Sequence, residues 1–138
     1  MASNKLRLKV ITPERIKYDE DADMVIMRCT TGDMGILPRH EPCSAILGDG
    51  VLRIITGDDE LRMAVFGGIA QVRDDVVTIL ANDAQWPDEI DRAHVEAEHE
   101  RIKSDAEIER DEILIRRMLV QIEVSSYPLM SKTRRVND

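Results

Sequence analysis

Residues 31 to 42 read TGDMGILPRHEP, and they hold two glycines and two prolines within twelve positions. The prolines exclude a regular helix and an uninterrupted strand. The glycines permit positive φ, while each proline holds the residue before it extended. The stretch therefore predicts a rigid, shaped loop with an apolar wedge of Met34, Ile36 and Leu37 and a polar tip at residues 39–41. A loop of this stiffness presents a surface to a substrate or to another protein.

Length and composition limit the classes of protein that the chain can belong to. Its 138 residues suit one domain, or one small domain with an appendage. The net charge of −8 argues against a nucleic acid as partner, because a phosphate backbone attracts basic proteins. Aromatic residues make up only 3% of the chain, so the core is expected to be aliphatic, with no platform for stacking bases or sugars.

Cys29 and Cys43 are the two cysteines, and no CxxC motif joins them. Two free thiols in a reducing compartment are the favoured interpretation, with a disulfide as the alternative. The first nine residues lack the apolar region of a signal peptide, and no stretch approaches 18 apolar residues. We therefore expect a soluble, intracellular chain that meets a membrane only through a partner.

Short apolar segments recur at intervals of roughly ten residues through the first part of the chain, separated by turn residues such as Gly48-Asp49-Gly50, a strong hairpin signal. No segment here is helical and long enough to connect two parallel strands. We therefore predict one antiparallel β-sandwich or barrel domain over residues 1–86. The predicted strands are Leu6–Val10, Met24–Met27, Ser44–Leu47, Val51–Ile55, Leu61–Phe66, Ile69–Val72 and Val76–Leu80, with a bulge or corner at Gly67-Gly68.

The pattern becomes helical after Trp86. Pro87 is typical of a first helical residue. Ile90, Ala93 and Ala97, with Val95 and Ile102 on an adjoining line, form a thin stripe of small apolar residues. A turn at residues 104–106 follows, and then a second helix whose stronger apolar stripe repeats every seven residues at Ile108, Ile115 and Ile122. Residues 87–138 are thus predicted to form an antiparallel two-helix hairpin with a frayed tail after Val124.

The hairpin alone should be marginally stable. Its first helix gains only a few kcal/mol by burying its stripe, at ~25 cal/mol per Å², whereas ordering the backbone costs ~1–2 kcal/mol per residue. The hairpin must therefore pack against the β domain, against a partner, or against each in turn.

Few residues suggest catalysis or metal binding. His40 and Glu41 lie near Cys43, but Pro42 intervenes and the β domain has no further histidine, so neither a metal site nor a Cys–His nucleophile pair is expected. His40 is better explained as a contact residue. Asp33 lies between two glycines and suits an acid offered to a basic patch on a partner. We predict no catalytic residue, no metal and no required cofactor.

Two motifs resemble those of a known family. The stretch at 31–42 resembles the signature loop of the epsilon subunit of bacterial F-type ATP synthase, usually G-[DE]-x-G-[IV]-x-P-x-H-x-P. FGGIAQV at 66–72, followed by VVTILA at 76–81, is similar to the family's G-G-x-x-x-V…V-T-[VI]-L-A. The order and spacing agree over essentially the whole chain, including the C-terminal helical pair.

The resemblance implies a non-catalytic subunit of the central stalk, or rotor, at the cytoplasmic face of the bacterial plasma membrane. It would couple proton translocation to ATP synthesis, with its sandwich bound to the gamma subunit and resting on the ring of c subunits. By position, Asp33 would face the c ring, and Thr12, His40 and Ala45 would lie against gamma. The C-terminal helices would reach the alpha/beta catalytic head and inhibit ATP hydrolysis.

A second function is implied by relatives that bind ATP on the hairpin through [IL]-D-x-x-R-A and a later arginine. Ile90-Asp91 fits this motif and Arg101 falls at the later arginine, but His94-Val95 replaces Arg-Ala. The alternative is therefore a nucleotide-binding sensor, with Asp91 and Arg101 as the ATP-binding residues and ATP as a regulatory ligand.

Overall fold

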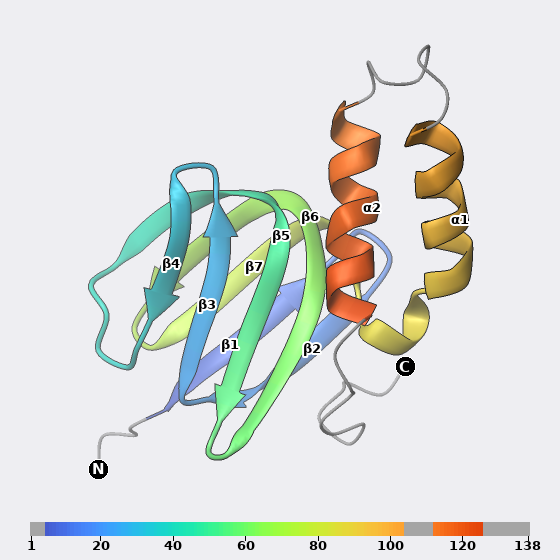
Figure 1. Cartoon of the computed structure of the whole chain (residues 1–138). Helices are drawn as coiled ribbons and strands as arrows, with labels where there is room; N and C mark the ends of the chain where they lie inside the picture. The colour runs from blue at the N-terminus through green and yellow to red at the C-terminus, as the bar shows by residue number, and fades with distance from the viewer. Residues whose placement is uncertain (1–4, 104–111, 126–138) are drawn as a thin grey trace.

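A computed structural model of the chain describes residues 5–103 and 112–125, and the side chains of residues 5–100 and 114–125. Seven strands come first and two helices follow (Figure 1). The strands are β1 (Leu6–Ile11), β2 (Ile16–Ala22), β3 (Met24–Cys29), β4 (Gly32–Ile36), β5 (Cys43–Thr56), β6 (Asp59–Arg73) and β7 (Val76–Gln85). A 3-10 turn, η1 (Pro87–Glu89), leads to α1 (Arg92–Lys103) and α2 (Glu112–Ser125).

The strands form one continuous sheet that folds over into a sandwich, in the order β2-β1-β7-β6-β5-β3-β4. All neighbouring pairs are antiparallel except one, because β1 and β7 run parallel. That pair departs from the purely antiparallel prediction. The whole β domain connects the two strands, so no short crossover is needed to bring them together in the same direction.

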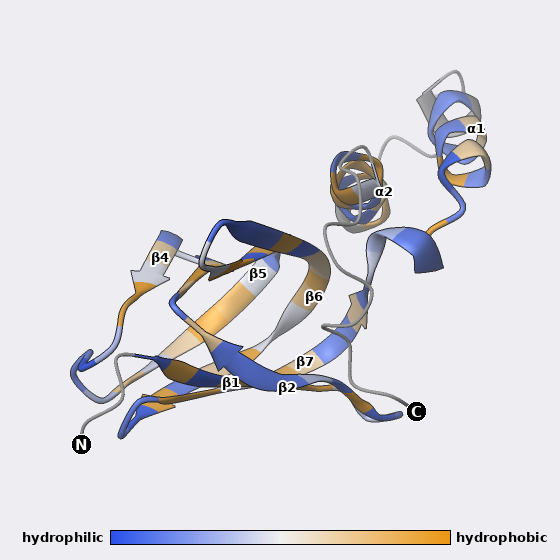
Figure 2. Cartoon of the chain, turned by 90° about the horizontal axis from the view of Figure 1, so that it is seen from below, coloured by the Kyte–Doolittle hydropathy of each residue, from blue (hydrophilic) through white to orange (hydrophobic). Residues whose placement is uncertain are grey.

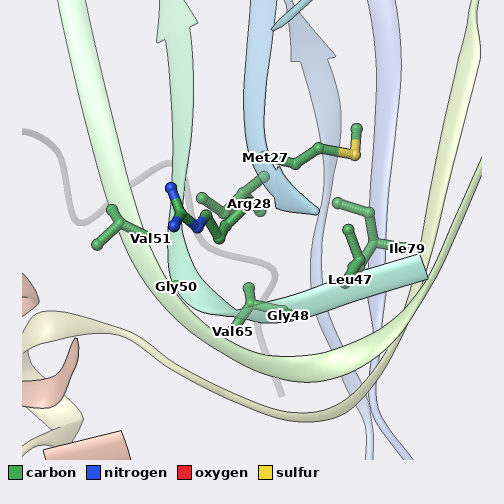
Figure 3. Close-up of a pocket in the computed structure, with 9 residues that line it drawn as sticks. Met27, Arg28, Leu47, Gly48, Gly50, Val51, Val65 and Ile79 are labelled. Atoms are coloured by element: carbon green, nitrogen blue, oxygen red, sulfur yellow. The ribbon is translucent and has the colours of Figure 1, made fainter. Parts of the chain in front are cut away.

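The predicted hairpin at Gly48-Asp49-Gly50 is wrong, because β5 runs unbroken from Cys43 to Thr56 and β6 pairs with it along most of its length. The segment is a bend instead. Gly50 is buried, and a Cβ there would collide with the side chain of Arg28 on β3. Figure 3 shows Arg28 beside this bend. Glycine is therefore needed here for close approach of two strands, not for a chain reversal.

The bend leaves a small cavity inside the sandwich of about 10 Å³, lined by Met27, Leu47, Ile79 and their neighbours (Figure 3). A space of this size holds about one water-sized probe and no organic ligand. The core around it is aliphatic, as predicted, with Tyr18 and Trp86 as its aromatic members. Both cysteines are free thiols, and burial raises the pKa of Cys29 above its usual value.

At Gly67-Gly68, where a bulge or corner is predicted, β6 runs unbroken and its register with β5 and β7 does not shift, so there is no bulge. The backbone is distorted there, since both glycines have positive φ. Gly68 has a φ of 127°, and a Cβ on it would collide with the carbonyl oxygen of Leu80 on β7. Both observations require glycine at this position.

The first helix begins later than predicted. Pro87 starts the 3-10 turn, and α1 begins at Arg92. Of the predicted stripe, Ile90 is buried but Ala93 and Ala97 are exposed. Among the described side chains of α1, Val95 on the adjoining line is the buried one. Because the helix starts after Ile90, that residue does not share a helical face with Ala93 and Ala97. The predicted turn at 104–106, Ile108 and the tail after Ser125 lie outside the described residues.

The second helix packs against the outside of the sandwich. A second apolar cluster joins Ala64 and Phe66 on β6 to Met118, Val120 and Val124 on α2, and Ile90 and Val95 are buried in it too. Figure 2 shows α2 next to the sandwich and α1 farther out. Of the arrangements that the sequence left open, the described structure has the hairpin docked on its own β domain.

Candidate functional site

The stretch at 31–42 is only in part the loop that the sequence predicts. Gly32–Ile36 forms β4 and pairs with β3. Ile36 is fully buried and Met34 packs against the core, so the predicted wedge reduces to Leu37, which is 55% exposed. The alternation of a strand places Met34 and Ile36 on the inner face, and this pairing was hidden by the surrounding glycines and prolines.

The rest of the stretch is a loop held against a neighbouring turn. Arg39 has a positive φ of 69°, which is uncommon for a residue other than glycine. Its backbone N–H donates to the carboxylate of Asp75 in the β6–β7 turn at 2.6 Å, and the N–H of His40 donates to the carbonyl of Leu37 at 3.2 Å. These bonds give the loop the rigidity that its prolines predict.

His40 and Cys43 do not form a catalytic pair. The Nδ1 atom of His40 lies 2.8 Å from the carbonyl oxygen of Glu41, which can only accept a hydrogen bond. Nδ1 therefore carries the proton and donates it, so it cannot act as a base toward the Cys43 thiol 3.9 Å away. Among the residues that the structure describes, no group of three or more potential ligands could hold a metal ion.

Asp33 lies near the start of β4 and His40 lies in the loop beyond its end at Ile36, so the structure does not bring these two predicted contact residues together. The carboxylate of Asp33 pairs with Arg28 on β3 at 3.2 Å, and both side chains are more than half exposed. Such a surface pair contributes ~0–1 kcal/mol. Asp33 can therefore exchange Arg28 for another cation at little cost.

An apolar row on the outer face of the sandwich is the feature that sequence reasoning missed. Ile46 on β5 lies opposite Ile69 on β6, and Ile69 lies opposite Leu80 on β7. Their exposed fractions are 65%, 54% and 53%. Ile11 on β1 lies opposite Leu80 and continues the row, so four strands contribute to it. We call these four residues the apolar row.

The next row along the same face is polar, with Ser44, Gln71 and Thr78 on the same three strands. An exposed apolar patch with a polar margin is typical of a protein–protein interface. One signal in the sequence could have revealed the row. Ile46 and Leu80 each stand beside a buried apolar neighbour, and adjacent strand residues face opposite sides of a sheet.

Thr12 and Ala45 are both close to the apolar row but differ in orientation. Thr12 follows Ile11, and its hydroxyl donates to the carbonyl of Arg15 at 3.0 Å, which fixes the β1–β2 turn. Ala45 packs inward against the core, whereas its neighbour Ile46 faces out. A contact through the Ala45 side chain is thus not available on this face, and Ile46 offers one in its place.

A polar and aromatic contact fixes α2 on the sandwich. The guanidinium of Arg117 lies 4.4 Å from the ring centroid of Phe66 and 3.2 Å from the carboxylate of Asp83. One turn later, the side-chain amide of Gln121 donates to Gln85 at 2.6 Å. Beside these contacts, an open groove of about 460 Å³ is lined by residues of α2 and of β3, β4, β5 and β6.

Of the two residues predicted to bind ATP, the structure describes the side chain of one, Asp91. Asp91 is the N-cap of α1, because its carboxylate accepts the N–H of His94 at 3.1 Å and its carbonyl accepts the N–H of Val95 at 3.0 Å. Arg101 lies within α1, but its side chain is outside the described residues. ATP binding therefore stays a prediction, and Asp91 already has a structural role.

No helix in the described part of the chain is long and apolar enough to cross a membrane. Residues 5–87 match the family described as ATP synthase, Delta/Epsilon chain, beta-sandwich domain. The ATP synthase epsilon chain of Alkalihalophilus pseudofirmus is 44% identical over 99 residues, which cover 72% of this chain and 74% of that relative.

Two solved structures show the same fold. A chain of the Euglena gracilis mitochondrial ATP synthase, in a structure of OSCP, F1 and the c-ring, aligns with a TM-score of 0.70 at 22% identity, covering 91% of this chain and 80% of that one. A chain of the central stalk and c-ring of the Tetrahymena thermophila mitochondrial enzyme aligns with a TM-score of 0.56 at 14% identity, covering 91% and 97%.

Proposed function

Because this chain belongs to the ATP synthase epsilon-chain family, as a non-catalytic subunit of the central stalk, we propose that it couples proton translocation to ATP synthesis and restrains ATP hydrolysis through its C-terminal helices. The observation that carries this proposal is the apolar row. It lies on a part of the sandwich that α2 does not cover, and so it stays available to a partner while the hairpin is docked.

The partner that we assign to the apolar row is the gamma subunit. Three aliphatic side chains that are more than half exposed give a surface whose burial stabilises association, by about 1.5–3 kcal/mol for each side chain fully buried. Thr12 lies at one end of this row, consistent with its expected place against gamma. The polar row beside it supplies the margin that limits the contact.

The second partner that we assign is the c ring, which would contact Asp33. Asp33 is exposed and its pair with Arg28 is weak, so a basic side chain of the ring can compete for the carboxylate. The loop that carries His40 is rigid and leaves Leu37 exposed, which suits a second contact with the stalk. We place the subunit with this complex at the cytoplasmic face of the bacterial plasma membrane.

The hairpin suits an inhibitory role because it is attached to the sandwich by a small interface. Among the described residues, one apolar cluster makes this contact, with three residues of α2 together with Ile90 and Val95, and the polar contacts of Arg117 and Gln121 lie beside it. Release of α2 would uncover its docked apolar face, which includes Met118, Val120 and Val124. In that state, the helices would reach the alpha/beta catalytic head.

A binding experiment tests the role of the apolar row. We expect Ile69→Glu to weaken binding of this chain to the gamma subunit about 30- to 150-fold, since an unpaired charge in an apolar contact costs about 2–3 kcal/mol. Gln71→Glu is the matched control, because it places the same charge on the same strand and face in the polar row. Equal affinity for the Ile69→Glu variant and the wild-type chain, measured by calorimetry, would refute this docking surface.

A hydrolysis experiment tests the role of the hairpin. Removal of residues 91–138 should leave assembly of the stalk intact and raise ATP hydrolysis by the reconstituted enzyme. Unchanged hydrolysis would contradict the inhibitory role.

A further inference from the structure

The end of the β domain is fixed by Trp86, which is 2% exposed and packs on Tyr18 with ring centroids 5.9 Å apart. The indole N–H donates to the carbonyl of Lys17 on β2 at 3.3 Å. The sandwich therefore holds the chain firmly one residue beyond the last strand.

The 3-10 turn that follows is also bound to β2. The carboxylate of Glu89 accepts two hydrogen bonds from the ammonium of Lys17, at 2.7 and 2.8 Å, and one from the guanidinium of Arg15 at 2.8 Å. It accepts a fourth from the backbone N–H of Trp86 at 2.7 Å. We call Arg15, Lys17 and Glu89 the root clamp.

The root clamp has one buried member, Lys17, whereas the side chains of Glu89 and Arg15 are 26% and 41% exposed. Lys17 is 8% exposed and is the one buried charged residue in the described part of the chain. Burial alone would raise the pKa of Glu89, but its hydrogen bonds with Lys17 and with the Trp86 backbone prevail, and the pKa is lowered. Removing the charge of Glu89 is costly, because it leaves the buried ammonium of Lys17 uncompensated.

Ile90 connects the clamp to the docked helix. Its backbone is extended, with φ −101° and ψ 122°, and its side chain is buried in the cluster that includes Phe66 and Met118. Asp91 then caps α1. A single extended residue thus separates the clamped turn from the first residue that belongs to the helix.

We propose that the root clamp extends the rigid sandwich to Ile90, makes Asp91 the pivot of the hairpin, and holds Ile90 as part of the seat on which α2 docks. The boundary between the two parts of the chain then lies after Ile90, not at the predicted position after Trp86. This inference rests on the proposed function in one respect, namely that the hairpin leaves its docked position.

Hydrogen exchange on the isolated full-length chain tests the clamp. The amides of Glu89 and Ile90 donate to the carbonyls of Trp86 and Pro87, so they report the state of the turn directly. In the wild-type chain, they should exchange together with those of β7 and roughly 100-fold more slowly than those of α1. Exchange of these amides at the rate of α1 would overturn the proposal.

The variant Glu89→Gln should speed exchange of the Glu89 and Ile90 amides by about tenfold or more and should also speed exchange in α2. Lys17→Met is a second variant that should give the same pattern. Glu60→Gln is the matched control, because Glu60 also bridges two basic side chains, Arg53 and Arg62, but within the β5–β6 pair. If Glu89→Gln and Glu60→Gln speed exchange in α2 equally, the proposal that the clamp holds Ile90 as part of the docking seat for α2 is wrong.

These results are independent of the hydrolysis experiment. If exchange follows the expected pattern while removal of residues 91–138 leaves hydrolysis unchanged, the clamp stands and the inhibitory role fails. If hydrolysis rises but the turn exchanges with α1, the inhibitory role stands and the clamp fails.

Discussion

Phe66 offers a direct test of how α2 is held on the sandwich. Its ring lies on the outer face of β6, is 3% exposed, and supports the guanidinium of Arg117 at 4.4 Å. Truncation by Phe66→Ala removes the largest side chain that the sandwich contributes to this contact. Because the ring faces α2 and not the interior of the sandwich, most of the loss should fall on docking of the helix.

The size of the effect follows from burial. Replacing a buried phenylalanine by alanine typically costs about 3–5 kcal/mol, and a cation–π contact accounts for about 0.5–1 kcal/mol. If part of this cost is recovered as the cavity collapses, docking of α2 should weaken by about 2–4 kcal/mol. This corresponds to a shift of about 30- to 700-fold in the docking equilibrium, at 1.4 kcal/mol for each factor of ten.

Two measurements on the isolated chain separate docking from folding. Hydrogen exchange of the α2 amides reports docking, while fluorescence of Trp86, the only tryptophan, reports unfolding of the sandwich in urea. Phe66→Ala should speed exchange in α2 and change the fluorescence midpoint little. Phe66→Leu is the control, because it keeps most of the apolar volume and should cost about 1 kcal/mol.

One result would refute this reasoning. If Phe66→Ala left exchange in α2 unchanged and lowered the midpoint of Trp86 fluorescence, the ring would stabilise the sandwich and not the helix.

Three other substitutions test separate parts of the structure. Gly68→Ala should destabilise the sandwich by about 3 kcal/mol or more, since a φ of 127° and a collision with Leu80 combine, and an unchanged urea midpoint would contradict this. Asp91→Ala should cost α1 about 1 kcal/mol through loss of its N-cap, seen as faster exchange in α1 with an unchanged Trp86 transition. The pKa of Glu89 is lowered in the folded chain, so its charge stabilises the fold above its unfolded pKa of about 4.3, and this contribution is lost as pH falls through the folded value. Glu89→Gln should therefore reduce the acid sensitivity of the urea midpoint, and an identical pH profile would count against the root clamp.

The amino-acid sequence by itself determined the class of fold. Short apolar segments identified β1, β3 and β7 and the two halves of β5 and of β6, but not β2 or β4, and the pair Gly67-Gly68 marked the distorted point in β6. The helical periodicity after Trp86 identified the two helices. These are local signals, because the side-chain directions in a strand or helix follow from the backbone alone.

Only the tertiary structure decided how these elements are used. Gly48-Asp49-Gly50 is a bend and not a hairpin because β6 and β3 pair with β5 on either side of it. The apolar row exists because register places Ile46, Ile69 and Leu80 next to one another, although 34 positions separate the first from the last. Glu89 acts as a clamp because β2, some 70 residues earlier, supplies Lys17. Each of these features depends on which distant segments become neighbours, and strand pairing over the whole domain fixes that choice where local propensity cannot.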